Sequence, residues 1–324
     1  MSRTPQPAAL DGILVVDKPR GKTSHDVVET VRRLAGFRQI GHLGTLDPLA
    51  TGVLVLVLGR ATRLARFYAG RRKRYTCAIR FGFATDTYDA DGEALGPDSA
   101  PVLDAEQIAG MAAEFTGRIR QTPPAFSAKK IHGRAAHELA RKKKPVHLEP
   151  AEVDVYEFRL TGIEGSTAQM VVECGPGTYI RSLADDLGKR HGSGAHLSEI
   201  TRTASGEFTL DRAIPLAELA EEAKNGKLAE RVIRLENMLA DLPQTAVLPI
   251  VEKHIRNGAK FNVSLAQIKP GSVTAAQDAP AALNSGEWRP GWLRVFGEQG
   301  QLIAIAEPIV PRTYRPVVVL ETSA

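Results

Sequence analysis

The residues best suited to chemistry lie in one twelve-residue stretch, Gly41–Gly52, with the sequence GHLGTLDPLATG. It holds three glycines, His42 and the Asp47-Pro48 step, and it leads into the apolar run at 53–58. Glycine permits positive φ and close backbone approach, and an Asp-Pro step favours a turn. A carboxylate presented by a loop ahead of a buried strand can attack a sugar carbon or an electrophilic ring carbon without a metal. The spacing alone leaves open a second interpretation, in which Asp47 only caps the turn.

Asp47 must be ionised to attack, so a neighbouring cation should favour the charged form of its carboxyl group. Arg181 is the candidate, at the end of the glycine-bearing stretch 175–181; its alternative role is a surface ion pair at a helix start. Competing chemistries lack their patterns, since the chain has neither G-x-S-x-G nor H-E-x-x-H. A phosphate-binding loop ending at Gly21-Lys22-Thr23 would need glycine at position 16, which is valine.

The composition is that of a soluble globular protein, with 43% hydrophobic and 24% charged residues. The apolar run at 53–58 is far shorter than the about 20 residues that span a bilayer, and the N-terminus has no signal-peptide core. We therefore expect a cytoplasmic protein and no membrane. Cys77 and Cys174 lie in strand-like stretches without zinc-ligand spacing, so we expect buried reduced thiols and no metal.

Positive charge is clustered more than the formal net charge of +5 suggests. Arg71–Arg74 and Arg141–Lys144 are two compact basic blocks. A single block is most often a solvated surface, but two blocks near candidate site segments favour a polyanionic partner.

The elements that must position these groups follow from hydrophobic periodicity and turn residues. Strands are predicted at 10–18, 53–58, 73–81, 152–161, 167–174 and 197–210, and helices at 25–35, 60–69, 104–118, after Arg181 and over 215–240. The acidic turn 85–92 is expected to be a polar loop, and 119–150, basic and proline-bounded, an excursion available to a ligand. The Asp241-Leu242-Pro243 step marks a boundary, so we predict an α+β domain at 1–240 and a small β module at 241–324.

Several of these stretches together resemble the motifs of one enzyme family. GHLGTLDPLATG resembles the signature of the TruB family of pseudouridine synthases. Four further matches occur in the family's order over about residues 10–205: Asp17-Lys18-Pro19, Lys73-Arg74-Tyr75, Gly177–Arg181 and Gly194–Leu197. The segment from 241 onward is similar only loosely, to the family's PUA-type RNA-binding module.

The resemblance implies a pseudouridine synthase fold, in which helices flank a central mixed, largely antiparallel sheet, with a small C-terminal PUA-like β-barrel. It implies isomerisation of the uridine at position 55 in the tRNA T-loop, without a cofactor, by a monomer that needs no protein partner. Two alternatives remain: a guide-RNA-dependent synthase of the same superfamily, and a non-catalytic tRNA-binding chaperone.

The resemblance also implies roles for individual residues. Asp47 would be the nucleophile, paired with Arg181, although attack at C1′, attack at C6 and a glycal route are not distinguished. Tyr75 would stack on the flipped uracil, Tyr179 would line the pocket, and Ile200, at a position that is often leucine in the family, would form an apolar wall. His42, oriented by Asp86, would fill the space that flipped-out bases vacate. Tyr75 could instead be a core tyrosine, and His42 a structural hydrogen bonder. RNA contacts are expected from Lys18, Lys129, Lys130, Arg141, Lys142, Lys143 and Lys144.

Overall fold

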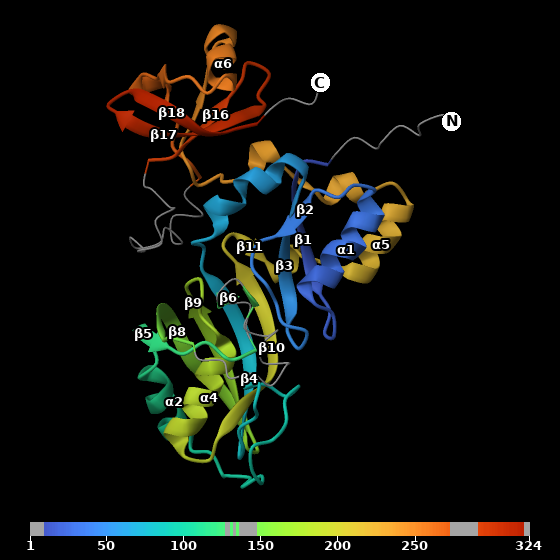
Figure 1. Cartoon of the computed structure of the whole chain (residues 1–324), viewed down its shortest axis with the longest axis vertical. Helices are drawn as coiled ribbons and strands as arrows, with labels where there is room; N and C mark the ends of the chain where they lie inside the picture. Colours follow the sequence, from blue (N-terminus) through green and yellow to red (C-terminus); the bar gives the residue numbers. More distant parts are fainter. Residues whose placement is uncertain (1–9, 127–129, 132–133, 136–147, 273–290, 321–324) are drawn as a thin grey trace.

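The computed structural model describes residues 10–126, 130–131, 134–135, 148–272 and 291–320 (Figure 1). Eleven strands form one large sheet whose backbone order is β12-β1-β3-β10-β4-β9-β8-β5, with β2, β11 and β13 attached beside this path. In chain order they are β1 (Gly12–Lys18), β2 (Ile40–His42), β3 (Thr51–Leu58), β4 (Lys73–Phe81), β5 (Gly117–Gln121), β8 (Ala151–Glu164), β9 (Thr167–Cys174), β10 (Ala195–Ser205), β11 (Phe208–Thr209), β12 (Ile214–Pro215) and β13 (Ile233–Arg234).

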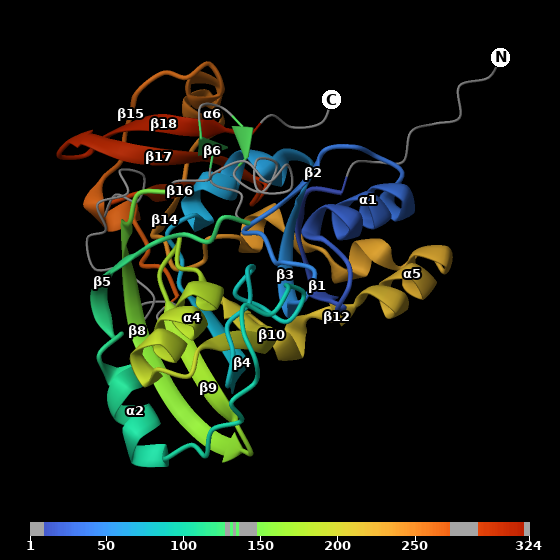
Figure 2. The same cartoon turned by 60° about the horizontal axis from the view of Figure 1, so that its bottom comes forward.

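Most neighbours in this sheet are antiparallel, while β3 with β10 and β1 with β12 are parallel. The mixed, largely antiparallel sheet predicted for the fold is therefore confirmed. Figures 1 and 2 show two helices at one end of the sheet and two others at the opposite end. These helices are α1 (Ser24–Ala35) with α5 (Leu216–Lys224), and α2 (Ala105–Ala113) with α4 (Ile180–His191).

The packing of strand β3 on both of its faces explains why its sequence is continuously apolar. Leu54, Leu56 and Leu58 belong to the core shared with α1, α4 and α5, whereas Val53, Val55 and Val57 pack into a second core on the other face. The second core includes the 3₁₀ helix η1 (Gly59–Tyr68). A strand covered on both faces loses the polar alternation of a half-exposed strand.

A second sheet follows at the C-terminus, in the order β14-β16-β17-β18-β15. Helix α6 (Pro249–Arg256) packs against it; its strands are β14 (Gln244–Ala246), β15 (Phe261–Asn262), β16 (Leu293–Phe296), β17 (Leu302–Val310) and β18 (Thr313–Val319). The second core continues into this sheet, where the rings of Phe67 and Trp292 meet edge to face with centroids 4.4 Å apart. This small β module agrees with the predicted PUA-like domain, and the division at 240/241 stays a prediction.

Three predicted elements differ from the structure. The helix predicted over 104–118 ends at Ala113, since Gly117–Gln121 forms β5 at the sheet edge beside β8. The predicted strand 197–210 is β10 followed by a reversal at Gly206 into β11. Helix does not fill 215–240: after α5 come short 3₁₀ turns and β13, which pairs with β1. In the first and third cases a long-range strand pairing prevailed over local helix propensity, and in the second a local hairpin turn at Gly206 divides the predicted strand.

Two short strands, β6 (Lys130–Ile131) and β7 (Arg134–Ala135), pair with each other within the predicted excursion. In the part of the chain that the structure describes, no helix is long and apolar enough to cross a membrane.

Candidate active site

A pocket of about 600 Å³ opens at the centre of the large sheet, where β3, β10 and β4 lie side by side. Six segments that are far apart in the sequence line it: residues 42–50, the end of η1, the start of β4, Asp89, residues 175–181 and β10. The pocket therefore brings together the two glycine-bearing stretches that the sequence singles out.

Asp47 lies in the tight turn between β2 and β3, where the amide of Ala50 donates to its carbonyl oxygen (3.1 Å). The neighbouring side chains of Leu46 and Leu49 are buried and anchor this turn to the core, while the Asp47 side chain is 45% exposed. The amide of Leu46 donates to the hydroxyl of buried Ser24 (2.8 Å), and this hydroxyl donates to the carbonyl of Leu46 (3.0 Å). The turn thus presents a reachable carboxylate from a fixed backbone.

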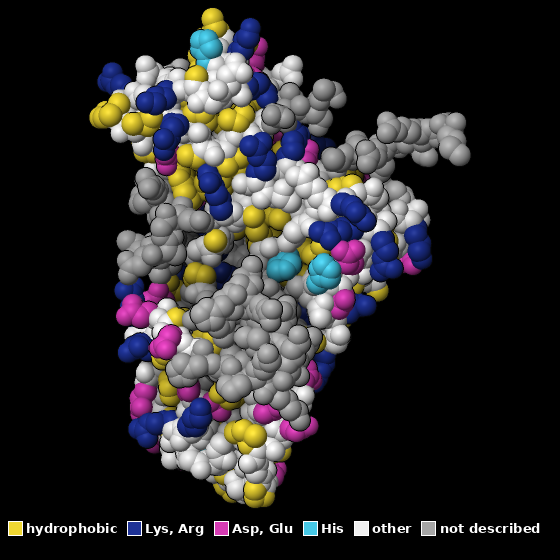
Figure 3. All heavy atoms as spheres, viewed as in Figure 1, with side chains coloured by type: hydrophobic (Ala, Val, Ile, Leu, Met, Phe, Trp, Pro, Cys, Tyr) yellow, Lys and Arg dark blue, Asp and Glu magenta, His cyan; other side chains and the backbone are white. Residues whose placement is uncertain are grey.

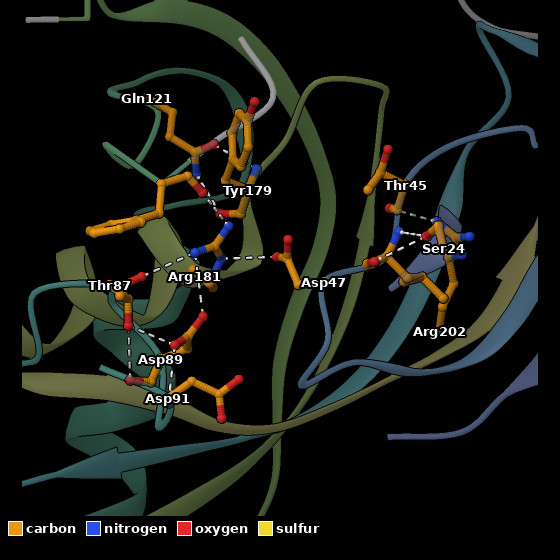
Figure 4. A network of polar contacts seen from close by, with 12 residues as sticks. Ser24, Thr45, Asp47, Thr87, Asp89, Asp91, Gln121, Tyr179, Arg181 and Arg202 are labelled. Carbon is orange, nitrogen blue, oxygen red and sulfur yellow. Dashed lines mark hydrogen bonds and ion pairs between the residues drawn. The ribbon is translucent and has the colours of Figure 1, made fainter. Parts of the chain in front are cut away.

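Arg181, in the first turn of α4, holds two carboxylates at once (Figure 4). Its Nε lies 3.0 Å from Oδ2 of Asp47, and its Nη1 lies 3.3 Å from Oδ2 of Asp89. The guanidinium also donates to the carbonyls of Thr87 (3.2 Å) and Phe126 (2.9 Å). Since a guanidinium is planar with fixed donor directions, these four bonds fix the direction in which Nε points at Asp47.

The electrostatics of Asp47 result from opposing effects. Enclosure by the pocket raises the pKa of the Asp47 carboxyl, the Arg181 guanidinium lowers it, and the Asp89 carboxylate raises it again. The net shift is upward, so Arg181 favours the charged form, as expected, but only offsets part of the desolvation.

Tyr75 and Ile200 form adjoining parts of the pocket wall, from the neighbouring strands β4 and β10. Both are nearly buried, and both belong to the main core as well as to the pocket lining. Tyr75 is therefore a core residue that also lines the pocket, and its role as a stacking platform stays a prediction. Burial raises the pKa of its hydroxyl, so Tyr75 is neutral at physiological pH.

Tyr179 lines the pocket from the residue before α4. The side-chain amide of buried Gln121 accepts from the backbone amide of Tyr179 (2.8 Å) and donates to its carbonyl (3.0 Å). Gln121 ends β5, so the edge of the sheet fixes the start of the helix that carries Arg181.

His42 lines the pocket as well, and burial lowers its pKa and favours the neutral ring. The expected partner, Asp86, is exposed, and its carboxylate accepts from the amide of Glu93 (2.8 Å). It is Asp89, three residues further on, that faces the site.

The expectation that Lys18 contacts RNA does not fit its position. Its side chain is 0% exposed, and its ammonium donates to the carbonyls of Lys22 (2.6 Å), Pro19 (3.0 Å) and Pro48 (3.5 Å). Burial lowers the pKa of Lys18 to about 8 although Asp47 lies near. Lys18 therefore supports the turn after Asp47 from beneath and offers no ammonium to a phosphate.

Most of the other residues that are expected to contact RNA lie outside the described part of the chain. Lys129 and the block Arg141, Lys142, Lys143 and Lys144 lie outside the described residues, and Lys130 is described only as part of β6. Within the described ranges, no group of three or more His, Cys, Asp or Glu side chains is placed to hold a metal ion.

Asp89, Gln121 and Arg202 bond to site residues or to the Asp47 turn and were not among the predicted site residues. One local signal bears on Asp89. The preceding Tyr88 adopts φ 65°, which is rare outside glycine and marks a constrained turn.

Two family models match the chain. Residues 32–180 match the N-terminal domain of the TruB family pseudouridylate synthases, and residues 181–244 match the tRNA pseudouridylate synthase B C-terminal domain. A tRNA pseudouridine synthase B of Solibacter usitatus is 43% identical over 96% of this chain and 100% of its own length. Another, of Pelotomaculum thermopropionicum, is 39% identical over 92% of this chain and 91% of its own.

Among solved structures, a chain of a Cbf5-Nop10-Gar1 complex superposes with a TM-score of 0.68 at 23% identity, covering 96% of this chain and 84% of that one. A chain of an H/ACA RNP bound to a substrate RNA containing 2′-deoxyuridine gives 0.66 at 23% identity, covering 93% and 79%. At this identity the likeness establishes a common fold.

Proposed function

This chain belongs to the TruB family of pseudouridine synthases, and from this premise we propose that it converts the uridine at position 55 of the tRNA T-loop into pseudouridine. It is an isomerase that acts on uridine in tRNA. The proposal adds the position in the T-loop, the nucleophile and the residues that surround the base.

The reaction conserves atoms and needs no oxidant or reductant. The glycosidic bond between N1 and C1′ breaks, uracil turns within the pocket, and C5 bonds to C1′. The proton that leaves C5 is balanced by one gained at N1, so no cofactor takes part. Attack of Asp47 at C1′, attack at C6 and a glycal route all require an ionised carboxylate at this place.

The observation that carries the proposal is the contact of one buried guanidinium with Asp47 in a pocket of about 600 Å³, which has room for a flipped nucleotide. Arg181 offsets part of the desolvation that opposes ionisation of the carboxylate and aims it, which a charge-assisted hydrogen bond does better than a neutral one. Tyr75 offers a π-face on which uracil stacks, and Ile200 and Tyr179 wall the base. His42 fills the space that flipped-out loop bases vacate.

The target uridine must first be unstacked from its neighbouring bases in the T-loop and flipped out. Extruding a nucleotide costs a few kcal/mol, which contacts with the RNA backbone offset. Lys129, Lys130, Arg141 and Lys142–Lys144 are the proposed clamp on the T-arm phosphates. On the face in Figure 3, Lys and Arg side chains are also spread over the C-terminal module and the region next to it. Residues 241–324 are proposed to extend this surface as a second RNA-binding domain, beside a catalytic domain at 1–240.

The decisive experiment uses purified protein and a bare T-arm stem-loop, with pseudouridine located by chemical mapping. We expect product at the T-loop uridine without guide RNA or added protein, from a monomeric cytoplasmic enzyme. A strict requirement for a guide RNA and protein partners would replace the proposal by the guide-dependent alternative.

A further inference from the structure

Arg202 on β10 is a buried cation that bonds to backbone atoms around the Asp47 turn. Its side chain is 1% exposed, and its Nε donates to the carbonyl of Val53 (2.7 Å). Its two terminal nitrogens donate to the carbonyls of Gly44 (3.2 Å) and Thr45 (3.5 Å). Among the described residues, no carboxylate forms an ion pair with it.

These bonds join the two ends of one loop. Gly44 and Thr45 precede Asp47, whereas Val53 follows it in β3. The backbones also approach closely here: Gly52 lies opposite Arg202 in the parallel pair, and a Cβ on Gly52 would lie 2.3 Å from the carbonyl oxygen of Arg202. Arg202 therefore ties together the two ends of the loop between residues 44 and 53.

The same residue is tied to the wall of the pocket. Arg202 follows Ile200 by two positions and is the register partner of Tyr75 on β4, so the three side chains share one face of the sheet. All three line the pocket. Ser24 and Gly21 also hold the turn, through Leu46 and Pro48, but they hold it from the side of α1.

We propose that Arg202 is a positioning residue, which sets the distance between the Asp47 carboxylate and a base held by Tyr75 and Ile200. The inference rests on the proposed role of Asp47. Arg202 acts through the carbonyls of Gly44, Thr45 and Val53 and touches no reacting atom. A displacement of about 1 Å at a reacting group can cost about 100-fold in rate, so a loop tether of this kind has a measurable effect.

The charge of Arg202 supports this view of the site. Burial is the main cause of the lowered pKa of His42, of Lys18 and of Lys73, which lie around the Asp47 loop, and the charge of Arg202 adds to it in each case. Removal of the guanidinium therefore changes both the shape of the loop and the potential around it.

The test compares Arg202→Met and Arg202→Lys with a matched control, Arg294→Met. Arg294 on β16 is similarly buried and also donates to backbone carbonyls, those of Leu242, Met238, Glu236 and Ala240, where the chain passes from the large sheet to the C-terminal module. Three quantities are measured on the full chain: the single-turnover rate on a T-arm stem-loop with enzyme in excess, the Kd of that RNA, and the melting temperature.

We expect Arg202→Met to slow the single turnover by about 100-fold while Kd changes less than about threefold, and Arg202→Lys to fall between it and the unchanged enzyme. Arg294→Met should lower the melting temperature and leave the rate per folded molecule within about twofold. If Arg202→Met does not fold, millimolar methylguanidinium should restore turnover to Arg202→Ala, because the vacated site lines the pocket.

A rate for Arg202→Met within about threefold of the unchanged enzyme would overturn the inference, as would an equal loss in Arg294→Met. An Arg202→Ala variant that folds, loses turnover and gains none with methylguanidinium would overturn it as well. If the unchanged enzyme itself modifies no T-arm, the proposed function fails instead, so the two failures are distinguishable.

Discussion

The Nε atom of Arg181 lies 3.0 Å from Oδ2 of Asp47, while Nη1 of the same guanidinium lies 3.3 Å from Oδ2 of Asp89. The two carboxylates differ in access, since the Asp47 side chain is 45% exposed and that of Asp89 only 7%. Asp89 is also fixed by the hydroxyl of Thr87 (2.6 Å) and the amide of Asp91 (3.2 Å). The Arg181 guanidinium thus pairs with the accessible carboxylate of Asp47 and with the buried carboxylate of Asp89, and Asp89 orients the guanidinium.

Asp47→Asn should abolish pseudouridine formation and leave tRNA binding intact. The amide keeps the size of the side chain but is no longer an anionic nucleophile. Product is measured by chemical mapping, and Kd by filter binding. Product formed by pure Asp47→Asn would remove the catalytic assignment of Asp47. If the unchanged protein also binds tRNA without forming product, the chaperone alternative fits instead.

Asp89→Asn should lower the single-turnover rate at least about tenfold, because Arg181 loses a charge-assisted partner that fixes its direction. It should also move the acid limb of the pH–rate profile to lower pH. The Asp89 charge raises the pKa of Asp47, so its removal lowers that pKa and keeps Asp47 ionised further into acid.

The control for this variant is Asp91→Asn. The Asp91 side chain is exposed and, in Figure 4, extends away from Arg181, so neither the rate nor the acid limb should change. An acid limb of Asp89→Asn that stays in place or moves to higher pH would contradict the electrostatic account of Asp47.

Replacing Lys142–Lys144 by glutamine should weaken tRNA binding and flatten its salt dependence. Each lost phosphate contact reduces the slope of log K against log [salt] by about 0.7–0.9. Titrations at several salt concentrations measure the slope, and the single-turnover rate at saturation should be unchanged. An unaltered Kd and slope would exclude these lysines from the RNA clamp.

Asp241→Asn should lower the free energy of unfolding by about 1–3 kcal/mol, because the buried guanidinium of Arg71 loses its charged partner at 2.6 Å and keeps the nearby carboxylate of Glu207. The pair lies where the large sheet leads into the C-terminal module. Trp292 belongs to the core at this junction, so its fluorescence should report unfolding in urea. Glu221→Gln, which breaks the exposed pair with Lys224, is the control and should cost less than about 0.5 kcal/mol. Equal stability losses in the two variants would show that the junction pair contributes nothing beyond a surface pair.

Much of this protein is determined by its sequence alone. The order of its motifs over about residues 10–205 indicated the family and its mixed sheet, and the short strands and Gly/Pro turns after Asp241 predicted the small β module. Asp47, Tyr75 and Arg181 were named from these motifs and Ile200 from the resemblance as a whole, and the structure places all of them around one pocket. The continuous apolar pattern of β3 also predicted a strand covered on both faces.

Only the tertiary structure decided which polar groups face each other. Asp86, Asp89 and Asp91 are equivalent in a local pattern, and the turn at Tyr88 selects Asp89 to meet Arg181. Lys18 looked like a basic contact for RNA and is buried. Arg202 carries no local signal, because its partners at Gly44, Thr45 and Val53 lie about 150 residues away and are backbone carbonyls, which every residue has. Long-range pairing of β10 with β3 and β4 brings it to the Asp47 loop, and pairing of this kind cannot be read from short-range sequence patterns.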